Sequence, residues 1–303
     1  MLLFVKKWVI FLCQVTVFTP TYNRAHTLVA CYESLCRQTS VEFIWIIVDD
    51  GSIDETSTLI NMWISEDIIK IKYYWQPNQG KHIAFNTGVS MADGELFLCL
   101  DSDDLLLDNA IEVIIKKWGN NNNHYAGIIA CKSNMKGLVV GSMLPEKLKV
   151  STVYDLYNIF RVQGDKLMIF NANIIKKYQF PVIEGEKFVT EALIYDQIDK
   201  NYEWLLLNEV LYQCEYLSDG YTANDKQLLL RNPKGFAMYF RNRMKIGHSF
   251  KTRYLYAVRY VNCVFISKNK FYLKDSPAKL LTMLAIPTAI VLYFYKYSKY
   301  NTD

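Results

Sequence analysis

The sequence lacks the short signatures of several large groups of nucleotide-binding proteins. It contains neither the phosphate-loop pattern GxxxxGK[ST] nor a GxGxxG turn after its first expected strand. Both patterns let backbone amides cradle phosphates, so their absence argues against a P-loop ATPase and a dinucleotide-dependent dehydrogenase. The net charge is a mild +4, and no dense basic stripe with interleaved aromatic residues occurs. This argues against a nucleic-acid partner.

Cysteine is present, but not in the patterns that form zinc sites or disulfide frameworks. The seven cysteines are odd in number, and none forms a CxxC pair. Several lie in apolar runs, where a free thiol behaves as a small hydrophobic side chain. We therefore expect a reducing, cytoplasmic environment and no structural zinc.

No apolar run has the length or the flanks of a typical membrane or secretion segment. Residues 1–13 are apolar apart from Lys6 and Lys7, which interrupt the run instead of preceding it as in a signal peptide. Leu280–Phe294 contains Pro287 and is 15 residues long, short of the roughly 20 that span a bilayer. We expect an interfacial or re-entrant helix there, with a buried core helix as the alternative. The first interpretation predicts peripheral contact with the inner face of the cell membrane.

The sequence does contain a series of apolar runs that end in polar residues. Residues 14–18, 43–48, 68–75 and 95–100 are predicted to be strands, and Pro20 is expected to stop the first. Each is followed by apolar residues at the three- and four-residue spacing of a helix. Four such units predict an α/β fold, doubly wound, with a mostly parallel sheet.

Carboxylates follow two of these strands. Asp49 and Asp50 come after the second strand, and Asp101, Asp103 and Asp104 come after the fourth. Packing three carboxylates together costs electrostatic energy unless a cation lies between them. Because open α/β sheets bind ligands at the carboxyl ends of their strands, these residues predict a divalent metal that holds a phosphorylated ligand.

Cations lie in the loops after the first and third strands. Arg24 and Lys81 could contact the phosphates of a nucleoside diphosphate, with the carboxylates serving a metal and the base. An ordinary strand-to-helix loop is the alternative interpretation of Thr19–Arg24. A turn followed by a helix cap would likewise account for Gly51 and Ser52, but it does not require two adjacent aspartates.

Four motifs in register on the expected strand ends resemble family 2 glycosyltransferases, which have the GT-A fold. They are Val17–Arg24, Val48–Ser52, Asn78–Lys81 with Ala84 and Asn86, and Asp101–Asp104. The resemblance covers about residues 14–130, and Gly164–Lys166 with Gly185–Glu191 extends it to about residue 222. It implies inverting transfer of a sugar from a nucleoside-diphosphate sugar, with a UDP-sugar as the expected donor, to an acceptor hydroxyl.

The resemblance also implies roles for the matching residues. The donor-binding residues would be Thr19, Tyr22, Arg24, Asp49, Asp50, Lys81 and Asp101. Of the adjacent pair, Asp50 is favoured as the residue that binds the base, and Asp101 would meet the ribose. Asp103, with Asp104, would hold Mg²⁺ or Mn²⁺ on the diphosphate, which makes Asp103 part of the catalytic machinery.

The catalytic base departs from the family pattern. The family commonly supplies it from a Glu-Asp or Thr-Glu-Asp motif, whereas this chain has Thr190, Glu191 and then Ala192, so only Glu191 matches. Asp165 and Asp196 are the other candidates. A carboxylate in the first turn of a helix is also favoured by the helix dipole, so a helix cap is the alternative interpretation of Glu191.

Three segments are expected. They are an N-terminal extension (1–13), a GT-A catalytic domain (14–222, with a nucleotide-sugar half to about 130 and an acceptor half from about 131) and a basic helical region with an apolar tail (223–303). The basic residues between 225 and 275, Arg243 among them, are expected on a solvated face or on one that meets an acidic membrane or acceptor. The expected activity is metal-dependent synthesis of a cell-surface polysaccharide or lipid-linked glycan. A nucleotidyltransferase and a non-catalytic nucleotide-sugar-binding protein are the alternatives.

Overall fold

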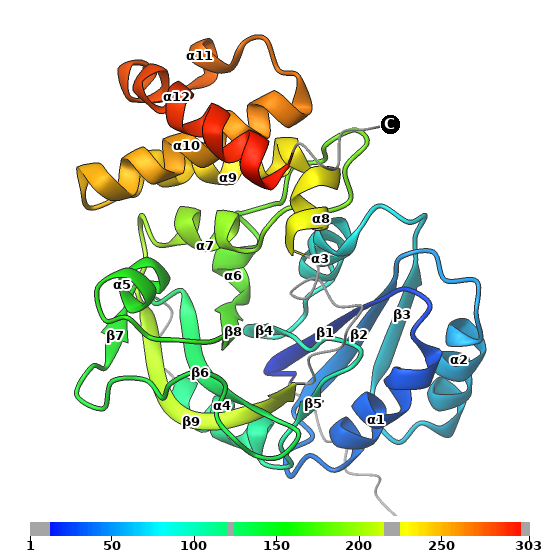
Figure 1. The fold of residues 1–303 in the computed structure, drawn as a ribbon. Coiled ribbons are helices and arrows are strands. Elements are labelled where there is room, and N and C mark those ends of the chain that lie inside the picture. The colour runs from blue at the N-terminus through cyan, green and yellow to red at the C-terminus, as the bar shows by residue number, and fades with distance from the viewer. Residues whose placement is uncertain (1–12, 120–123, 215–224, 298–303) are drawn as a thin grey trace, which may run out of the picture. The chain divides into compact units, whose positions relative to one another are not determined.

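Figure 1 shows the protein as a computed structural model, which describes residues 13–119, 124–214 and 225–297. The predictions for residues 1–12, for the loop at 120–123 and for 215–222 lie outside these residues. The chain packs into two compact units. Of the described residues, the first comprises 13–78, 84–119, 124–177 and 201–214, and the second comprises 79–83, 178–200 and 225–297. The three predicted segment boundaries stay predictions.

The first unit is built on one mixed sheet of nine strands, counted over the described residues. The strands are β1 (Val15–Thr21), β2 (Phe43–Asp49), β3 (Ile71–Trp75), β4 (Leu96–Cys99), β5 (Leu105–Leu106), β6 (Gly127–Asn134), β7 (Val150–Ser151), β8 (Lys166–Asn171) and β9 (Trp204–Cys214). Their order is β3-β2-β1-β4-β8-β6-β9-β5, with β7 on β9. The first four are parallel neighbours, and the sheet continues through the antiparallel pairs β4–β8 and β8–β6. The α/β fold class is confirmed.

Pro20 was expected to stop the first strand, but the strand continues through it to Thr21. β1 pairs with β2 through Thr21, which lies opposite Asp49, whereas its pairing with β4 ends where Phe18 meets Cys99. The carbonyl of Thr21 accepts a hydrogen bond from the N–H of Asp50, which directly follows β2. Backbone groups alternate between the two sides of a strand, so the backbone nitrogen of Pro20 points toward the β4 side. No ladder bond is needed there, so the missing N–H of proline costs nothing.

Helices cover both faces of this sheet (Figure 1). They are α1 (Ala25–Cys36), α2 (Thr56–Glu66), α3 (Lys81–Ser90), α4 (Ala110–Trp118), α5 (Val153–Asn158) and α6 (Ala172–Ile175). The expected apolar face of α1 is buried with α2 and α4 around Trp45 and Trp63. On the opposite face of the sheet, Phe85 of α3 packs against Phe18 with ring centroids 5.8 Å apart. This two-sided cover accounts for the continuous apolar sequence of β1 and β2.

The second unit is helical. Its helices are α7 (Ala192–Ile198), α8 (Asp225–Arg231), α9 (Pro233–Ile246), α10 (Phe250–Ser267), α11 (Tyr272–Asp275) and α12 (Lys279–Lys296). α9, α10 and α12 share a core that includes Met244, Val261 and Ala285. Glu186 accepts hydrogen bonds from the backbone N–H groups of Lys234 and Gly235 at 2.7 and 2.8 Å. It thereby caps α9 and ties the 178–200 segment to that helix.

Two features of the second unit differ from expectation. Arg243, expected on an exposed basic face, is 7% exposed because it forms an ion pair with Asp196. The apolar tail forms a single helix, α12, which continues through Pro287 for 18 residues. By length and composition α12 could cross a membrane, and 22% of it is buried.

Candidate functional site

The carboxyl ends of β1, β2 and β4 meet at one edge of the first unit's sheet. β1 lies between the other two strands and is parallel to both. The segment that contains Asp49 and Asp50 therefore begins beside Thr21, and the segment that begins at Asp101 follows β4 on the other side. The topology brings the two predicted acidic segments to the same edge, which is where open α/β sheets bind ligands.

The loops after β1 and β2 are fastened to each other. The N–H of Asn23 donates to Oγ of Ser52 at 2.8 Å, and Oδ1 of Asn23 accepts from the N–H of Ile53 at 2.9 Å. Gly51 has a φ of +90°, and a Cβ there would lie 2.9 Å from the backbone nitrogen of Asn78. A side chain at position 51 would be strained in its backbone and crowded by the third loop, so glycine is required.

The two adjacent aspartates have different partners. Asp49 is fully buried, and its carboxylate accepts from the N–H of Ser52 and the hydroxyl of Tyr73, both at 2.8 Å. Asp50 is 4% exposed and accepts from Nε2 of Gln76 at 2.8 Å. Both oxygens of Asp49 serve the turn, so it acts as a support of the loop.

The other predicted residues of the first loop differ in exposure. Thr19 is fully buried, and its Oγ1 accepts from Nε1 of Trp45 at 2.8 Å, so its hydroxyl helps to position the strand end. Tyr22 is 49% exposed. Arg24 is half-buried directly before α1. Tyr22 and Arg24 are thus the side chains of this loop that a ligand could reach.

The acidic segment after β4 is held by a tyrosine from β9. Tyr212 is fully buried, and its hydroxyl donates to Oδ2 of Asp104 at 2.6 Å. The same hydroxyl accepts from the N–H of Asp101 at 3.1 Å. Lys132 lies over the Tyr212 ring, 4.2 Å from its centroid. Asp104 is thereby turned into the protein, whereas Asp101 and Asp103 are half-buried.

The electrostatics of this segment favour a cation. Burial, reinforced by the charge of Asp101 and more weakly by that of Asp103, raises the pKa of Asp104 to about 7, although Tyr212 and Lys132 act in the opposite direction. A bound cation would relieve this crowding. Within the described ranges, no three His, Cys, Asp or Glu side chains are arranged as a metal cluster. The residues fit the other common arrangement, in which Mg²⁺ is held by one or two carboxylates and completed by substrate phosphates.

Lys81 and Glu191 lie together in the second unit. Nζ of Lys81 is 3.2 Å from Oε1 of Glu191, and Tyr195 donates its hydroxyl to Oε2 at 2.8 Å. The Glu191 side chain is 46% exposed. Glu191 is the N-cap residue of α7, as the helix-cap interpretation expected, but its side chain makes no capping hydrogen bond. Its carboxylate is oriented by a lysine and a tyrosine and remains accessible.

The two alternative base candidates lie in contrasting environments. Asp165 is exposed, in the first unit. Asp196, in α7, is 2% exposed; Nε of Arg243 lies 2.7 Å from its Oδ2, and Nδ2 of Asn242 donates to the same atom at 3.2 Å. Burial raises the pKa of Asp196 to about 6, against the effect of Arg243. Asp196 therefore serves as an internal link between α7 and α9.

Comparison with known sequences identifies the family. The model of the family described as Glycosyl transferase family 2 matches residues 16–176, more than half of the chain. This chain belongs to glycosyl transferase family 2. The match spans both acidic segments and the loops that support them.

Relatives within the family share part of their length with this chain. A Campylobacter jejuni protein named GalNAc(5)-diNAcBac-PP-undecaprenol beta-1,3-glucosyltransferase is 27% identical over 191 residues, which are 62% of this chain and 60% of the relative. Relatives from Rickettsia species are longer, and the chain covers about a fifth of their length (21% for that of Rickettsia felis).

Solved structures of similar fold extend over most of the chain. Staphylococcus aureus TarS in complex with UDP-GlcNAc is 18% identical, with a TM-score of 0.60 and coverage of 91% of this chain and 80% of TarS. A mannosyltransferase from Pyrobaculum calidifontis, in complex with GDP-Man and Mn²⁺, is 17% identical, with a TM-score of 0.56 and coverage of 93% and 81%. At these identities the likeness concerns the fold alone, and it agrees with the predicted GT-A architecture.

Sequence reasoning about this family 2 chain missed the residues that hold the site in place. Tyr212 and Gln76 orient Asp104 and Asp50, and Tyr195 orients Glu191. Tyr212 lies within a strand and Gln76 within a loop, where neither residue type is unusual. Tyr195 offered the one usable signal, because on a helix that begins near Glu191 a residue four positions later lies on the same side.

Proposed function

We propose that this chain is an inverting, metal-dependent glycosyltransferase that moves a sugar from a nucleoside-diphosphate sugar, with a UDP-sugar preferred, to a hydroxyl of a glycan or lipid-linked acceptor. The observation that carries the proposal is the convergence of two acidic segments at the carboxyl edge of the parallel strands, in a family 2 chain. The similar structures that hold UDP-GlcNAc and GDP-Man support this donor class. The name of the Campylobacter relative supports a lipid-linked acceptor in cell-surface glycan synthesis.

In this proposal the donor lies along the sheet edge of the first unit. Asp50, oriented by Gln76, accepts hydrogen bonds from the base, and Asp101 meets the ribose. Tyr22 and Arg24 border the nucleotide. The buried Asp49 and Thr19 act indirectly, because their polar atoms hold the two loops in position.

A divalent ion, Mg²⁺ or Mn²⁺, is proposed at the segment after β4. Asp103 is the first candidate ligand, because it is half-buried, while Asp104 also accepts from Tyr212. When bound, the ion would stabilise the negative charge that develops on the departing nucleoside diphosphate. The chain contributes a fixed carboxylate position, since Tyr212 restrains both Asp104 and the backbone of Asp101.

Glu191 is the proposed general base. Its carboxylate would accept the proton of the acceptor hydroxyl as that oxygen attacks the sugar. Lys81 and Tyr195 each hold one of its oxygens, which fixes the direction in which the carboxylate points.

A donor screen tests the proposal. The full chain is incubated with a panel of nucleotide sugars and Mn²⁺, and release of free nucleoside diphosphate is measured with and without glycan or lipid-linked acceptors. We expect release with at least one donor, loss of transfer with preserved donor binding in Glu191→Gln, and weaker metal-dependent donor binding in Asp103→Asn. Absence of hydrolysis and transfer with every donor would refute the enzyme and leave a nucleotide-sugar-binding protein. Full turnover by Glu191→Gln would remove this residue as the base.

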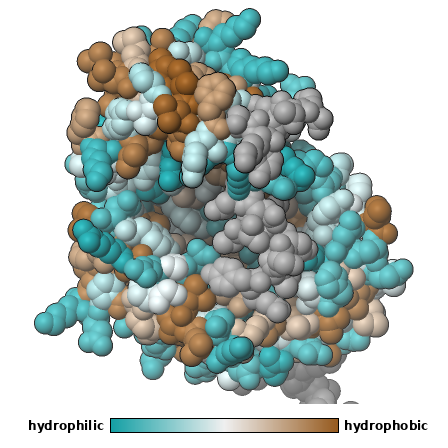
Figure 2. All heavy atoms as spheres, in the orientation of Figure 1, coloured by the Kyte–Doolittle hydropathy of each residue, from teal (hydrophilic) through white to brown (hydrophobic). Residues whose placement is uncertain are grey.

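We also propose that the second unit contacts an anionic membrane surface peripherally. Residues 225–297 contain 14 lysines and arginines against two aspartates, a formal charge of +12, although the whole chain carries only +4. One side of α12 packs inward through Leu281, Ala285 and Ala289. Its other side is apolar and exposed, with Leu284 and Val291 at 55% and 70%. Figure 2 shows apolar residues gathered at the position of α12 in Figure 1, beside hydrophilic ones.

This arrangement is typical of a helix that lies in the membrane interface. The 18 residues of α12 make a helix about 27 Å long, slightly short of the roughly 30 Å hydrocarbon core. An exposed apolar side surrounded by basic residues suits the boundary between acyl chains and anionic headgroups. Sedimentation with vesicles of phosphatidylglycerol and phosphatidylcholine provides the test. We expect binding to the anionic vesicles that falls with salt and is lost in Leu284→Asp/Val291→Asp; equal binding to pure phosphatidylcholine would refute the electrostatic part.

A further inference from the structure

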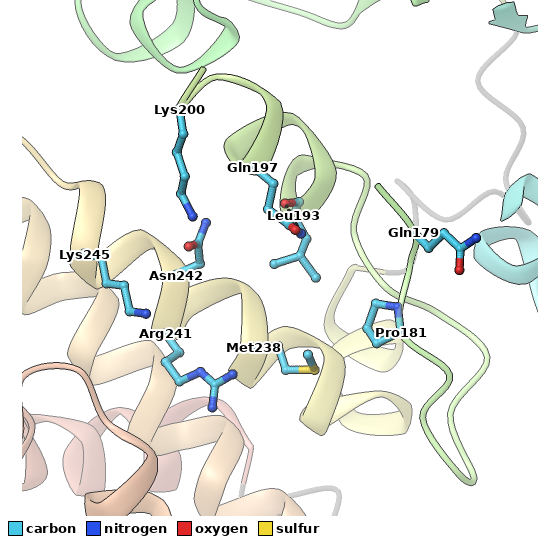
Figure 3. A pocket seen from close by; sticks show the side chains of 9 residues that line it. All are labelled: Gln179, Pro181, Leu193, Gln197, Lys200, Met238, Arg241, Asn242 and Lys245. Carbon is cyan, nitrogen blue, oxygen red and sulfur yellow. Dashed lines mark hydrogen bonds between the residues drawn. The ribbon is translucent and has the colours of Figure 1, made fainter. Parts of the chain in front are cut away.

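A cavity of about 310 Å³ lies within the second unit, and none of the residues assigned above to the donor or to catalysis lines it. Figure 3 shows the side chains around it, which come from α7, α9 and the segments beside α7. The lining residues are Gln179, Pro181, Leu193, Gln197, Lys200, Met238, Arg241, Asn242 and Lys245. A volume of this size falls within the range of small-ligand pockets and corresponds to about ten water molecules.

The lining follows from helix geometry. Met238, Arg241, Asn242 and Lys245 recur at intervals of three, one and three residues along α9, so they share one side of that helix. Leu193, Gln197 and Lys200 share one side of α7 and its continuation in the same way. Apolar atoms from Pro181, Leu193 and Met238 are thereby combined with three carboxamides and three cations.

The charge of the cavity is entirely of one sign. Lys200, Arg241 and Lys245 line it, and no aspartate or glutamate among the described residues does. None of the three forms an ion pair with a described carboxylate. Two acids belong to α7 and its C-terminal end: Asp196 is buried against Arg243, and Asp199, which precedes Lys200, does not line the cavity. Three cations that line one cavity without a carboxylate attract an anion from solution.

Hydrogen bonds within the second unit also restrain two of the residues that line the cavity. Asn242 donates to the buried Asp196, and Nε2 of Gln197 donates to the carbonyl of Leu193 at 3.1 Å. In Figure 3 the side chain of Lys200 extends toward Asn242, across from Lys245 on α9. Two of the polar lining residues are thus fixed by internal hydrogen bonds, while the cations keep their hydrogen-bonding capacity for a ligand.

We propose that this cavity binds a phosphoryl anion, in the form of a phosphate or diphosphate group. Arginine and lysine together are the side chains that proteins use for phosphate oxygens, and the carboxamides add neutral donors. The inference rests on the proposed function in one respect, because the anion is expected to be carried by the acceptor substrate. Free phosphate or diphosphate is the other possible source, with the same chemistry at the site.

Titration with inorganic pyrophosphate tests the site. Calorimetry on the full chain is carried out without divalent metal and at constant ionic strength, so that the acidic segment of the first unit repels the probe. We expect saturable binding that Arg241→Gln/Lys245→Gln weakens at least tenfold and Lys200→Gln weakens about threefold. Lys251→Gln, at an exposed position of α10 outside the cavity, is the matched control for loss of one charge and should bind normally. Arg241→Lys/Lys245→Arg should restore most of the affinity.

The outcomes distinguish the two possible sources of the anion, and they distinguish failure of the anion site from failure of the proposed glycosyltransferase activity. Pocket-dependent binding of farnesyl diphosphate in detergent micelles would support an acceptor-borne diphosphate, whereas binding of the inorganic ion alone would remove the acceptor as the source. No saturable binding at millimolar pyrophosphate, or equal binding by Lys200→Gln and the parent chain, would overturn the site. Donor hydrolysis by the unmodified chain is measured in parallel. Hydrolysis without pyrophosphate binding refutes this inference alone, and pyrophosphate binding without hydrolysis refutes the enzyme proposal alone.

Discussion

Replacing Arg243 by methionine should destabilise the second unit in a way that depends on pH. The side chains of Asp196 and Arg243 are 1% and 9% exposed, and Nε of the arginine is 2.7 Å from Oδ2 of the aspartate. Methionine keeps most of the volume but leaves a buried carboxylate without its cation. Removing one partner of a buried ion pair typically costs about 3–5 kcal/mol. We expect a loss of this size in the free energy of unfolding at pH 8.

The pH dependence follows from the pKa of Asp196. In the folded protein burial raises this pKa to about 6, above the ordinary value of 3.8. Protonated Asp196 therefore contributes to the free energy of unfolding. This contribution is complete below pH 3.8 and is lost as the pH rises through 6. Without Arg243 the folded-state pKa rises further, so the loss continues to higher pH. The difference between the variant and the parent should grow by about 1.4 kcal/mol per pH unit above 6, until the pKa of the variant is passed.

Amide hydrogen exchange is the suitable assay. The described tryptophans all lie in the first unit, so their fluorescence would not report on α7 and α9. A loss of about 3 kcal/mol corresponds to roughly 150-fold faster exchange of amides that open with these helices. Asp196→Asn/Arg243→Met should be more stable at pH 8 than Arg243→Met, because it carries no buried charge. A loss below about 1 kcal/mol, or equal losses at pH 6 and pH 8, would refute this account.

Three further predictions concern positions that hold the two units in shape. Tyr212→Phe removes the hydroxyl that donates to Asp104 and accepts from the N–H of Asp101, so we expect weaker metal-dependent donor binding and a small loss of stability; equal donor affinity in titrations with Mn²⁺ would contradict it. Gly51→Ala should destabilise the first unit by at least about 1 kcal/mol, measured by tryptophan fluorescence in urea, because of its positive φ and the contact with Asn78. Glu186→Gln keeps one accepting oxygen but loses the other, together with the charge at the start of α9, so exchange protection of that helix should fall by a factor of at least about five, whereas Glu186→Ala should cost more.

Most of the fold of residues 14–130 could be predicted because the sequence patterns that specify it are local. Apolar runs of strand length, each followed by a helical pattern, predict parallel strands, and the motifs lie at their carboxyl ends. The α/β class, the positions of the first four strands and the helix after each of them were predicted in this way. The prediction that β1 stops at Pro20 was wrong because it depended on tertiary structure: a strand tolerates proline only where no neighbouring strand needs its N–H.

The support of the site depended on tertiary structure. Tyr212 reaches Asp104 across 108 positions in the chain. Likewise, Asp196 determines that Arg243 is buried instead of facing solvent with the other basic residues. Side-chain type and spacing indicate which residues are able to bind a metal, a phosphate or a base. They do not indicate which of the protein's own donors each of two adjacent aspartates will meet, because that depends on partners that only the folded chain brings within hydrogen-bonding distance.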